Sequence, residues 1–187
     1  MILITGIGNK DMKYHNTRHN AGYFAIEPMR QALRFEGFIA HETLKRDRLL
    51  LSEVAIARWG QEKVILLQKT QTAMNRAGEA VKRVYDSYDI DELILFHDDL
   101  DIQLGEYKIQ KGKSPKGHNG VKSVEQAIGT KDFWRVRLGI DNREGKDIPG
   151  EEYVLERFKK EEREILNGAI IEACEELLFT ELFEKWI

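Results

Sequence analysis

The chain opens with Ile2-Leu3-Ile4-Thr5-Gly6-Ile7-Gly8-Asn9, and Thr17-Arg18-His19-Asn20-Ala21-Gly22 follows just before an apolar helical pattern. The apolar run at 2–4 predicts a buried strand, and the glycines with Asn9 predict a turn at its end. In sheets whose strands alternate with helices, ligands bind at such strand ends. We therefore expect His19 and nearby amide side chains to lie on the rim of one crevice.

Two further polar segments sit beside glycines or at the ends of apolar runs. A second histidine-asparagine pair occurs in His118-Asn119-Gly120. The apolar run 93–96 predicts a central strand buried on both faces, and we expect it to end where His97-Asp98-Asp99-Leu100-Asp101 begins. These segments predict a polar site assembled from distant parts of the chain.

The remaining pattern predicts an α/β fold. We expect helices at 21–35, where Pro28 delays the start or bends the axis, after residue 75, at 119–128 and at about 159–186. We expect a hairpin of strands 49–57 and 63–67, and strands 105–110 and 133–140, the last with one basic face. We expect the polar residues 141–151 to form a mobile loop. Together these elements predict a single-domain layered sandwich over 1–187, with a central mixed, mostly parallel twisted sheet flanked by helices.

Composition indicates an ordinary globular protein. The 187 residues are 42% hydrophobic and 33% charged, and the apolar runs are shorter than the roughly 18 residues of a membrane-spanning helix. We expect no signal peptide, because Met1 leads straight into a strand-like run. A single cysteine, Cys174, agrees with a reducing compartment. We therefore expect a cytoplasmic protein without a membrane partner.

Charge is unevenly distributed along the chain. The net charge is -3, but residues 151–187 hold eleven glutamates against five Lys or Arg, so residues 1–150 carry +3. A lysine cluster precedes and follows the second histidine-asparagine pair: Lys108, Lys111, Lys113, Lys116 and Lys122. A basic rim beside a polar pocket is typical of a phosphate-bearing substrate.

The chemistry that these residues allow is general-base hydrolysis. His19 can accept a proton from water near neutral pH, and Asp98 can orient its ring. Amide groups that can hold a water or an oxyanion are available at Asn9, Asn20, Asn75 and Asn119. The sequence contains no serine or cysteine in a nucleophile motif, so direct attack by water is favoured over a covalent intermediate.

Two other kinds of site are disfavoured. The group from His97 to Asp101 contains residue types that bind metals, but alternate side chains of an extended segment point to opposite faces and cannot all converge on one ion. We therefore expect no metal. Gly6-Ile7-Gly8 lacks the third glycine of a dinucleotide-binding motif.

These motifs, in this order, resemble those of the bacterial-type peptidyl-tRNA hydrolase family. The resemblance spans about residues 2–158 and rests on the joint pattern. The matching pieces are Gly6-Ile7-Gly8-Asn9, Tyr14, Thr17-Arg18-His19-Asn20-Ala21-Gly22, Met74-Asn75 with Gly78, His97-Asp98-Asp99-Leu100-Asp101 with Gly105, Gly117-His118-Asn119-Gly120, Phe133-Trp134-Arg135-Val136-Arg137-Leu138-Gly139-Ile140, and Tyr153-Val154-Leu155 with Phe158.

The resemblance implies a monomeric, cofactor-free esterase that frees tRNA from peptidyl-tRNA, contacting its acceptor end and peptide. It implies that His19 is the catalytic base and Asp98 its orienting partner. Asn9, Asn75 and Asn119 would position substrate and water, Tyr14 and Met74 would line the site, and His118 would contact the substrate or tRNA. Arg137 and lysines such as Lys108 and Lys111 would contact phosphates without reading sequence.

Some positions depart from the family pattern. Lys10-Asp11 replaces the usual residues after Asn9, so a looser turn is expected there, and Ala73, Ala77 and Pro115 also differ. These changes keep open a second hypothesis, an RNA- and protein-binding module similar to the chloroplast splicing-factor branch of the family. A third is a hydrolase of another blocked ester or amide.

Overall fold

The structure is a computed structural model that describes residues 1–41, 43–113 and 115–184. Its strands are β1 (Ile2–Gly6), β2 (Ile39–Ala40), β3 (Lys45–Asp47), β4 (Ser52–Trp59), β5 (Lys63–Thr70), β6 (Glu92–Gln103), β7 (Tyr107–Lys111) and β8 (Trp134–Asp141). Its α-helices are α1 (Ala21–Phe35), α2 (Ala77–Ser87), α3 (Asn119–Ile128), α4 (Gly150–Tyr153), α5 (Lys160–Leu178) and α6 (Glu181–Glu184). Short 3-10 turns are η1 (Met12–Tyr14), η2 (Arg18–Asn20) and η3 (Met74–Arg76).

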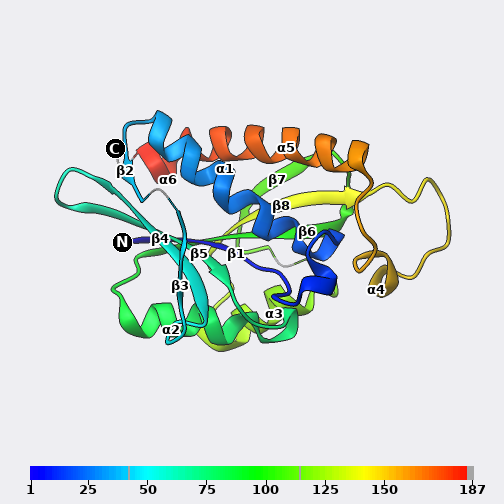
Figure 1. The fold of residues 1–187 in the computed structure, drawn as a ribbon, viewed down its shortest axis with the longest axis horizontal. Coiled ribbons are helices and arrows are strands. Elements are labelled where there is room, and N and C mark those ends of the chain that lie inside the picture. The colour runs from blue at the N-terminus through cyan, green and yellow to red at the C-terminus, as the bar shows by residue number, and fades with distance from the viewer. Residues whose placement is uncertain (42, 114, 185–187) are drawn as a thin grey trace.

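The strands form one mixed sheet in the order β2-β4-β5-β1-β6-β8-β7, with β3 paired to β4. The four central strands, β5, β1, β6 and β8, run parallel, whereas β4 and β7 add antiparallel pairings toward the two edges. Helices α1 and α5 cover one face of the sheet, and α2 and α3 cover the other (Figure 1). The predicted α/β sandwich with a mixed sheet is confirmed.

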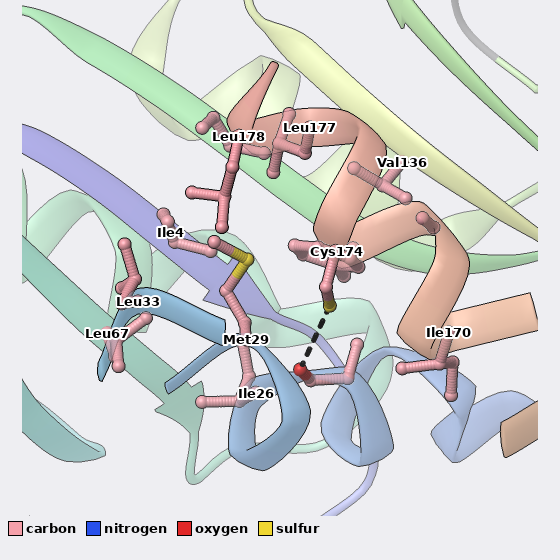
Figure 2. Close-up of a cluster of buried hydrophobic side chains, with 14 of the residues drawn as sticks. Ile4, Ile26, Met29, Leu33, Leu67, Val136, Ile170, Cys174, Leu177 and Leu178 are labelled. Carbon is pink, nitrogen blue, oxygen red and sulfur yellow. Dashed lines mark hydrogen bonds between the residues drawn. The ribbon is translucent and has the colours of Figure 1, made fainter. Parts of the chain in front are cut away.

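The apolar stripe of α1 forms much of the core between the sheet and the layer of α1 and α5. Ala21, Ala25, Met29 and Leu33 recur every four residues and are fully buried, as a period of 3.6 requires of a helix packed on one side. Figure 2 shows Met29 between Ile4 of β1 and the end of α5. The predicted helix 21–35 is therefore correct, and it begins at its expected first residue although Pro28 lies inside it.

The opposite layer depends on a close contact between two helices. A β-carbon added at Gly78 in α2 would lie 2.1 Å from the backbone oxygen of Ser123 in α3. The Ser123 hydroxyl accepts the backbone N–H of Gly78 at 3.0 Å. Gly129 ends α3 in the left-handed conformation that favours glycine, with φ of 77°. The bounds predicted for α3 are confirmed.

The prediction that the central strand ends at residue 96 is wrong. β6 continues to Gln103, and its pairing with β8 includes His97, Asp98 and Asp99 before a register shift. These three side chains are buried. Burial of Asp98 and Asp99 is tolerated because each binds side chains from other segments, which local sequence does not show. His97 binds only the carbonyl of the adjacent Asp98 through Nδ1, and its buried Nε2 has no hydrogen-bond partner among the described residues.

The predicted alternation of Arg135 and Arg137 along one strand is present in β8, but the face that they form is neutralised by acids. Arg135 and Arg137 of β8 are buried, and each forms an ion pair, with Glu125 and Asp99 respectively, at 2.7 Å. The predicted C-terminal helix at about 159–186 is divided in the structure, since α5 ends at Leu178 and α6 is a separate turn. Residues 185–186 of that prediction lie outside the described residues.

The hairpin prediction is confirmed in topology and shifted in its bounds. β4 and β5 pair antiparallel from Ser52 with Thr70 to Trp59 with Lys63, around a turn that contains Gly60 at φ 61°.

Among the described residues, none of the helices combines the length and the hydrophobicity that a membrane span needs.

The start of α1 approaches the backbone at the end of β1 and in the middle of β6. A β-carbon added at Gly22 would lie 2.3 Å from the carbonyl oxygen of Phe96 in β6 and 2.7 Å from that of Ile7. One added at Gly6 in β1 would lie 2.2 Å from the carbonyl oxygen of Gly22. Glycine is therefore required at 6 and 22 by packing, and the contact brings the residues before α1 to the end of β1 and the middle of β6.

We predict that Gly22→Ala lowers the free energy of unfolding by about 1–3 kcal/mol or more, because the methyl group would press against backbone atoms that cannot rotate away. Urea denaturation followed by far-UV circular dichroism measures the change.

Gly168→Ala is the matched control. Gly168 lies exposed in α5, and nothing lies within 4 Å of an added β-carbon. This substitution should stabilise the protein by about 0.5–1 kcal/mol through helix propensity. Equal stability of Gly22→Ala and the parent chain would contradict the close-packing interpretation.

Candidate active site

His19 lies in the 3-10 turn η2, directly before α1. Its backbone N–H donates to the carbonyl of Val154 at 2.8 Å, and the N–H of Arg18 donates to Glu156 at 3.0 Å. An isolated bridge also pairs Thr17 with Arg157. The turn is thus held between the start of α1 on one side and residues 154–157 on the other.

Asp98 of β6 holds the imidazole of His19. The Nδ1 atom of His19 lies 3.0 and 2.9 Å from the two carboxylate oxygens of Asp98. An ionised carboxylate only accepts hydrogen bonds, so Nδ1 carries the proton and donates it. In the neutral ring, Nε2 is then left with a lone pair that can accept a proton.

His118 binds the same carboxylate from the other side of the site. Its Nδ1 accepts the backbone N–H groups of Gly120 and Val121 at 3.1 and 3.2 Å, which caps the N-terminus of α3. The Nδ1 atom therefore has no proton, and Nε2–H donates to Asp98 at 3.0 Å. These bonds assign a hydrogen-bond partner to each ring nitrogen of His118 and fix the orientation of the ring.

The pKa values in this cluster follow from burial and charge. Burial of His19 acts to lower its pKa, but the charge of Asp98 and the hydrogen bond to it outweigh burial and hold the pKa above its ordinary value. Burial would raise the pKa of Asp98, but the two imidazoles lower it well below the usual range. Burial and the neighbouring His118 lower the pKa of His97 to about 3. Asp98 is thus ionised and His97 neutral at working pH.

Asn9 is anchored by a reciprocal pair of amides. Its backbone N–H donates to Asn20 Oδ1 at 2.8 Å, and Asn20 Nδ2 donates to the Asn9 carbonyl at 3.1 Å. The Asn9 Oδ1 atom accepts the N–H of Met74 at 2.9 Å, which leaves its amide N–H groups as donors. The N–H of Lys10 donates to Thr72 at 3.2 Å. The looser turn expected around Asn9 is therefore wrong.

A cavity of about 470 Å³ opens beside His19. β6 supplies acidic and apolar side chains to it, the segment before α3 supplies polar ones, and α4 with the residues after it forms the opposite wall. The lining consists of His19, Asp98, Asp99, Leu100, Asp101, Pro115, Lys116, Gly117, His118, Asn119, Gly150, Glu151, Val154 and Leu155. This cavity can hold a small organic group within reach of the imidazole.

The structure thus brings together His19, Asp98, His118 and Asn119 of the predicted site. Met74 is buried and lies near them, because a β-carbon added at Gly120 would come 2.3 Å from its sulfur atom. Asn9 is joined to Met74 by a hydrogen bond, whereas Tyr14 and Asn75 do not belong to the cavity lining. Tyr14 lies half-buried in η1 under Lys13, and Asn75 is exposed in a groove between α2 and α3.

The predicted phosphate contacts divide into two groups. Lys108 and Lys111 of β7 are exposed, as are Lys113, Lys116 and Lys122. Lys111 forms an ion pair with Glu92 at 3.2 Å. Arg137 is 6% exposed, and its guanidinium binds Asp99 and Gln110, so it does not offer a free cationic surface and its expected phosphate contact is withdrawn.

Sequence reasoning did not find the partners of Arg18. Its guanidinium is buried and binds both carboxylate oxygens of Glu162 in α5, 144 residues later. The signal available in the sequence was an arginine beside His19 in the motif, but nothing local indicates which acid it meets.

His19, Asp98 and His118 place three potential ligand atoms within 4.8 Å of one another. The atoms that face Asp98, Nδ1 of His19 and Nε2 of His118, already donate hydrogen bonds to it. A metal ion at this point would have to replace both protons. The geometry therefore favours a hydrogen-bonded carboxylate, and the absence of a metal requirement stays a prediction.

Comparisons with known proteins agree with this geometry. The family model described as peptidyl-tRNA hydrolase matches residues 3–185. A peptidyl-tRNA hydrolase of Limosilactobacillus fermentum is 35% identical over 189 residues, covering 100% of this chain and 93% of the relative. One of Shouchella clausii is 40% identical over 172 residues, covering 90% and 87%.

Solved structures agree as well. A crystal structure of peptidyl-tRNA hydrolase from Acinetobacter baumannii has a TM-score of 0.81 and 28% identity, covering 99% of this chain and 89% of that one. Because the family model spans nearly the whole sequence and the relatives exceed 30% identity over most of both lengths, this chain belongs to the peptidyl-tRNA hydrolase family.

Proposed function

We propose that this chain hydrolyses the ester bond between a peptide, or an N-blocked amino acid, and the ribose of the terminal adenosine of tRNA. The observation that carries the proposal is the hydrogen bond from His19 Nδ1 to Asp98, with the ring on the wall of a cavity. The names of its relatives, which all specify peptidyl-tRNA, support this substrate. The products are free tRNA and a peptide with a free carboxylate.

In the proposed reaction, His19 acts as a general base. Its Nε2 atom takes a proton from a water molecule while the water oxygen bonds to the ester carbonyl carbon. The tetrahedral intermediate then expels the ribose oxygen, which receives that proton from His19. Asp98 holds the ring in the tautomer with a free Nε2 and stabilises the imidazolium that forms, as in other histidine-acid pairs.

His118 has a positioning role in this proposal. It donates to one Asp98 oxygen and is fixed to the start of α3, so it limits the rotation of the carboxylate. Asn119 follows it on the cavity wall, where its amide can bind substrate or the attacking water. His118 therefore supports catalysis through Asp98 and contacts substrate at the cavity surface.

The proposal assigns roles to the other predicted contacts as well. The Asn9 amide N–H groups are assigned to the developing oxyanion or the peptide backbone, since its oxygen is already used by Met74. Asn75 and Tyr14 would be reached by parts of the substrate outside the cavity. Lys108, Lys111 and their lysine neighbours supply affinity for the tRNA phosphates.

We also propose that the chain works as a cytoplasmic monomer and that residues 1–187 form one domain. The pairing of every described strand into one sheet supports the last point. A binding module without activity is less favoured, because such a protein has no need of an ionised Asp98 that holds a proton-accepting imidazole.

We predict that His19→Ala lowers single-turnover cleavage of an N-blocked aminoacyl-tRNA by about a hundredfold or more, because the general base is lost. The assay measures released tRNA at saturating enzyme. His15→Ala is the matched control, since His15 is an exposed histidine in the same segment. Full activity of the His19 variant would reject the assigned base, and tRNA binding without cleavage by the parent chain would favour the binding module.

We predict a rate that rises with pH through one ionisation above 6.5 and then levels off. His19 must be neutral to accept a proton, and Asp98 holds its pKa above 6.5, so activity is lost as pH falls through that raised value. Asp98→Asn removes the charge that raises the pKa and leaves burial, which lowers it. In this variant the midpoint should move to lower pH and the plateau should fall by roughly a hundredfold. An unmoved midpoint would contradict this assignment.

We predict that 1,10-phenanthroline leaves the cleavage rate unchanged, because the imidazole rather than a metal ion activates the water. This chelator removes transition metals but spares the Mg²⁺ on which tRNA folding depends. Loss of activity that is restored by Zn²⁺ would show that His19, Asp98 and His118 act as metal ligands instead.

A further inference from the structure

Arg18 is the residue before the proposed general base, and its side chain is buried behind the site. Its Nη2 atom donates to the two oxygens of Glu162 at 2.9 and 3.0 Å. The guanidinium carbon lies 4.3 Å from the ring centre of Tyr153 and 5.0 Å from that of Phe158. The cation therefore lies between two aromatic rings with an acid as its partner.

Glu162 collects donors from several parts of the chain. Besides Arg18, it accepts the backbone N–H of Lys159 at 2.8 Å and the Nδ2 group of Asn142 at 3.2 Å. Burial would raise its pKa, but these hydrogen bonds and the Arg18 charge lower it, so the carboxylate is ionised. Glu162 thus joins the His19 turn to the start of α5 and to the loop after β8.

The backbone around Arg18 is tied to the same region. The N–H groups of Arg18 and His19 donate to Glu156 and Val154, and the N–H of Phe158 donates to Asn16 at 3.0 Å. Val154 also lines the cavity beside His19. One wall of the cavity and the residue that carries the imidazole are therefore held by a single set of contacts.

We propose that Arg18 and Glu162 are positioning residues for His19, which set the place of its imidazole against Asp98 without touching substrate. The α1 contact fixes the turn from one side, and the ion pair fixes it from the other. The guanidinium reaches both oxygens of Glu162 through Nη2 alone, while its Nε and Nη1 are buried without a hydrogen-bond partner among the described residues. Its position therefore depends on Glu162 and on the rings of Tyr153 and Phe158. The expected effect of these residues on the reaction rate rests on the proposed function. Their expected effect on the His19–Asp98 contact does not.

A shift of His19 away from Asp98 would change the pKa of His19, which a general loss of stability would not do. The carboxylate raises the pKa of His19, so a looser contact lowers it. Other charged or titratable groups on the same cavity, which must be considered in any titration, are Asp99 and Asp101 from β6, Lys116 and His118 from the segment before α3, and Glu151 from α4.

The first test is Glu162→Gln, which keeps the shape of the side chain and removes its charge. The pKa of His19 is measured in the full chain by ¹H–¹⁵N NMR with labelled histidine and without substrate. We expect it to fall relative to the parent chain, and kcat to fall by up to about a hundredfold with KM unchanged. Glu161→Gln, at the exposed neighbouring position in α5, is the matched control and should change neither quantity.

A second variant covers the case in which Glu162→Gln fails to fold. Arg18→Met combined with Glu162→Leu removes both charges, and such replacement of a buried pair is often neutral for stability. We expect this double variant to fold, with a lowered His19 pKa and a lowered kcat. A folded double variant with the parent pKa and parent rate would overturn the proposal. Failure of the parent chain to cleave its substrate would instead count against the proposed function, since the NMR titration does not depend on cleavage.

Discussion

The structure depends on the backbone contact between the start of α1, the end of β1 and the middle of β6. Gly22 approaches the carbonyl oxygens of Phe96 and Ile7 so closely that no side chain fits between them. Because His19 precedes this contact by three residues and Asp98 follows Phe96 by two, fixing the backbone here also fixes the distance between base and acid. The backbone atoms that pack α1 against the sheet therefore also set the position of His19 relative to Asp98.

The carboxylate of Asp98 accepts hydrogen bonds from two imidazoles with different tasks, His19 at both oxygens and His118 at Oδ1. His118 is held as a donor to Asp98 by the backbone N–H groups of α3, which occupy its other ring nitrogen. His19 has no such backbone bond on its ring, so its Nε2 remains available for proton transfer. The asymmetry arises from the position of each histidine, since one caps a helix and the other lies in a turn before one.

Much of the fold could be predicted because it follows from local periodicity. The spacing of apolar residues predicts the buried stripe of α1 and the extent of α3, and Gly129 marks the end of α3. The length of β6 could not be predicted in this way, because Asp99 is acceptable in a buried strand only when Arg137 lies on the next one. The same holds for Arg137 itself, whose charge suggests an exposed face until its partner is known.

The candidate site shows the same division. His19, Asp98 and His118 could be selected from motif and residue type, and they meet in space. Their supports could not be selected, because the partner of Arg18 comes from α5, far along the chain, and pairing at that separation leaves no local pattern. The positions of Asn75 and Tyr14 beyond the cavity lining also depend on how turns η1 and η3 sit against the sheet.

The cysteine in the α1–α5 core has a practical consequence. Cys174 is 1% exposed, its sulfur faces the carbonyl of Ala25, and burial raises the pKa of its thiol (Figure 2). Alkylating reagents attack the thiolate, so they can modify this chain only when α5 separates from α1. The rate of labelling by iodoacetamide therefore reports how often the helical layer opens, without an introduced probe.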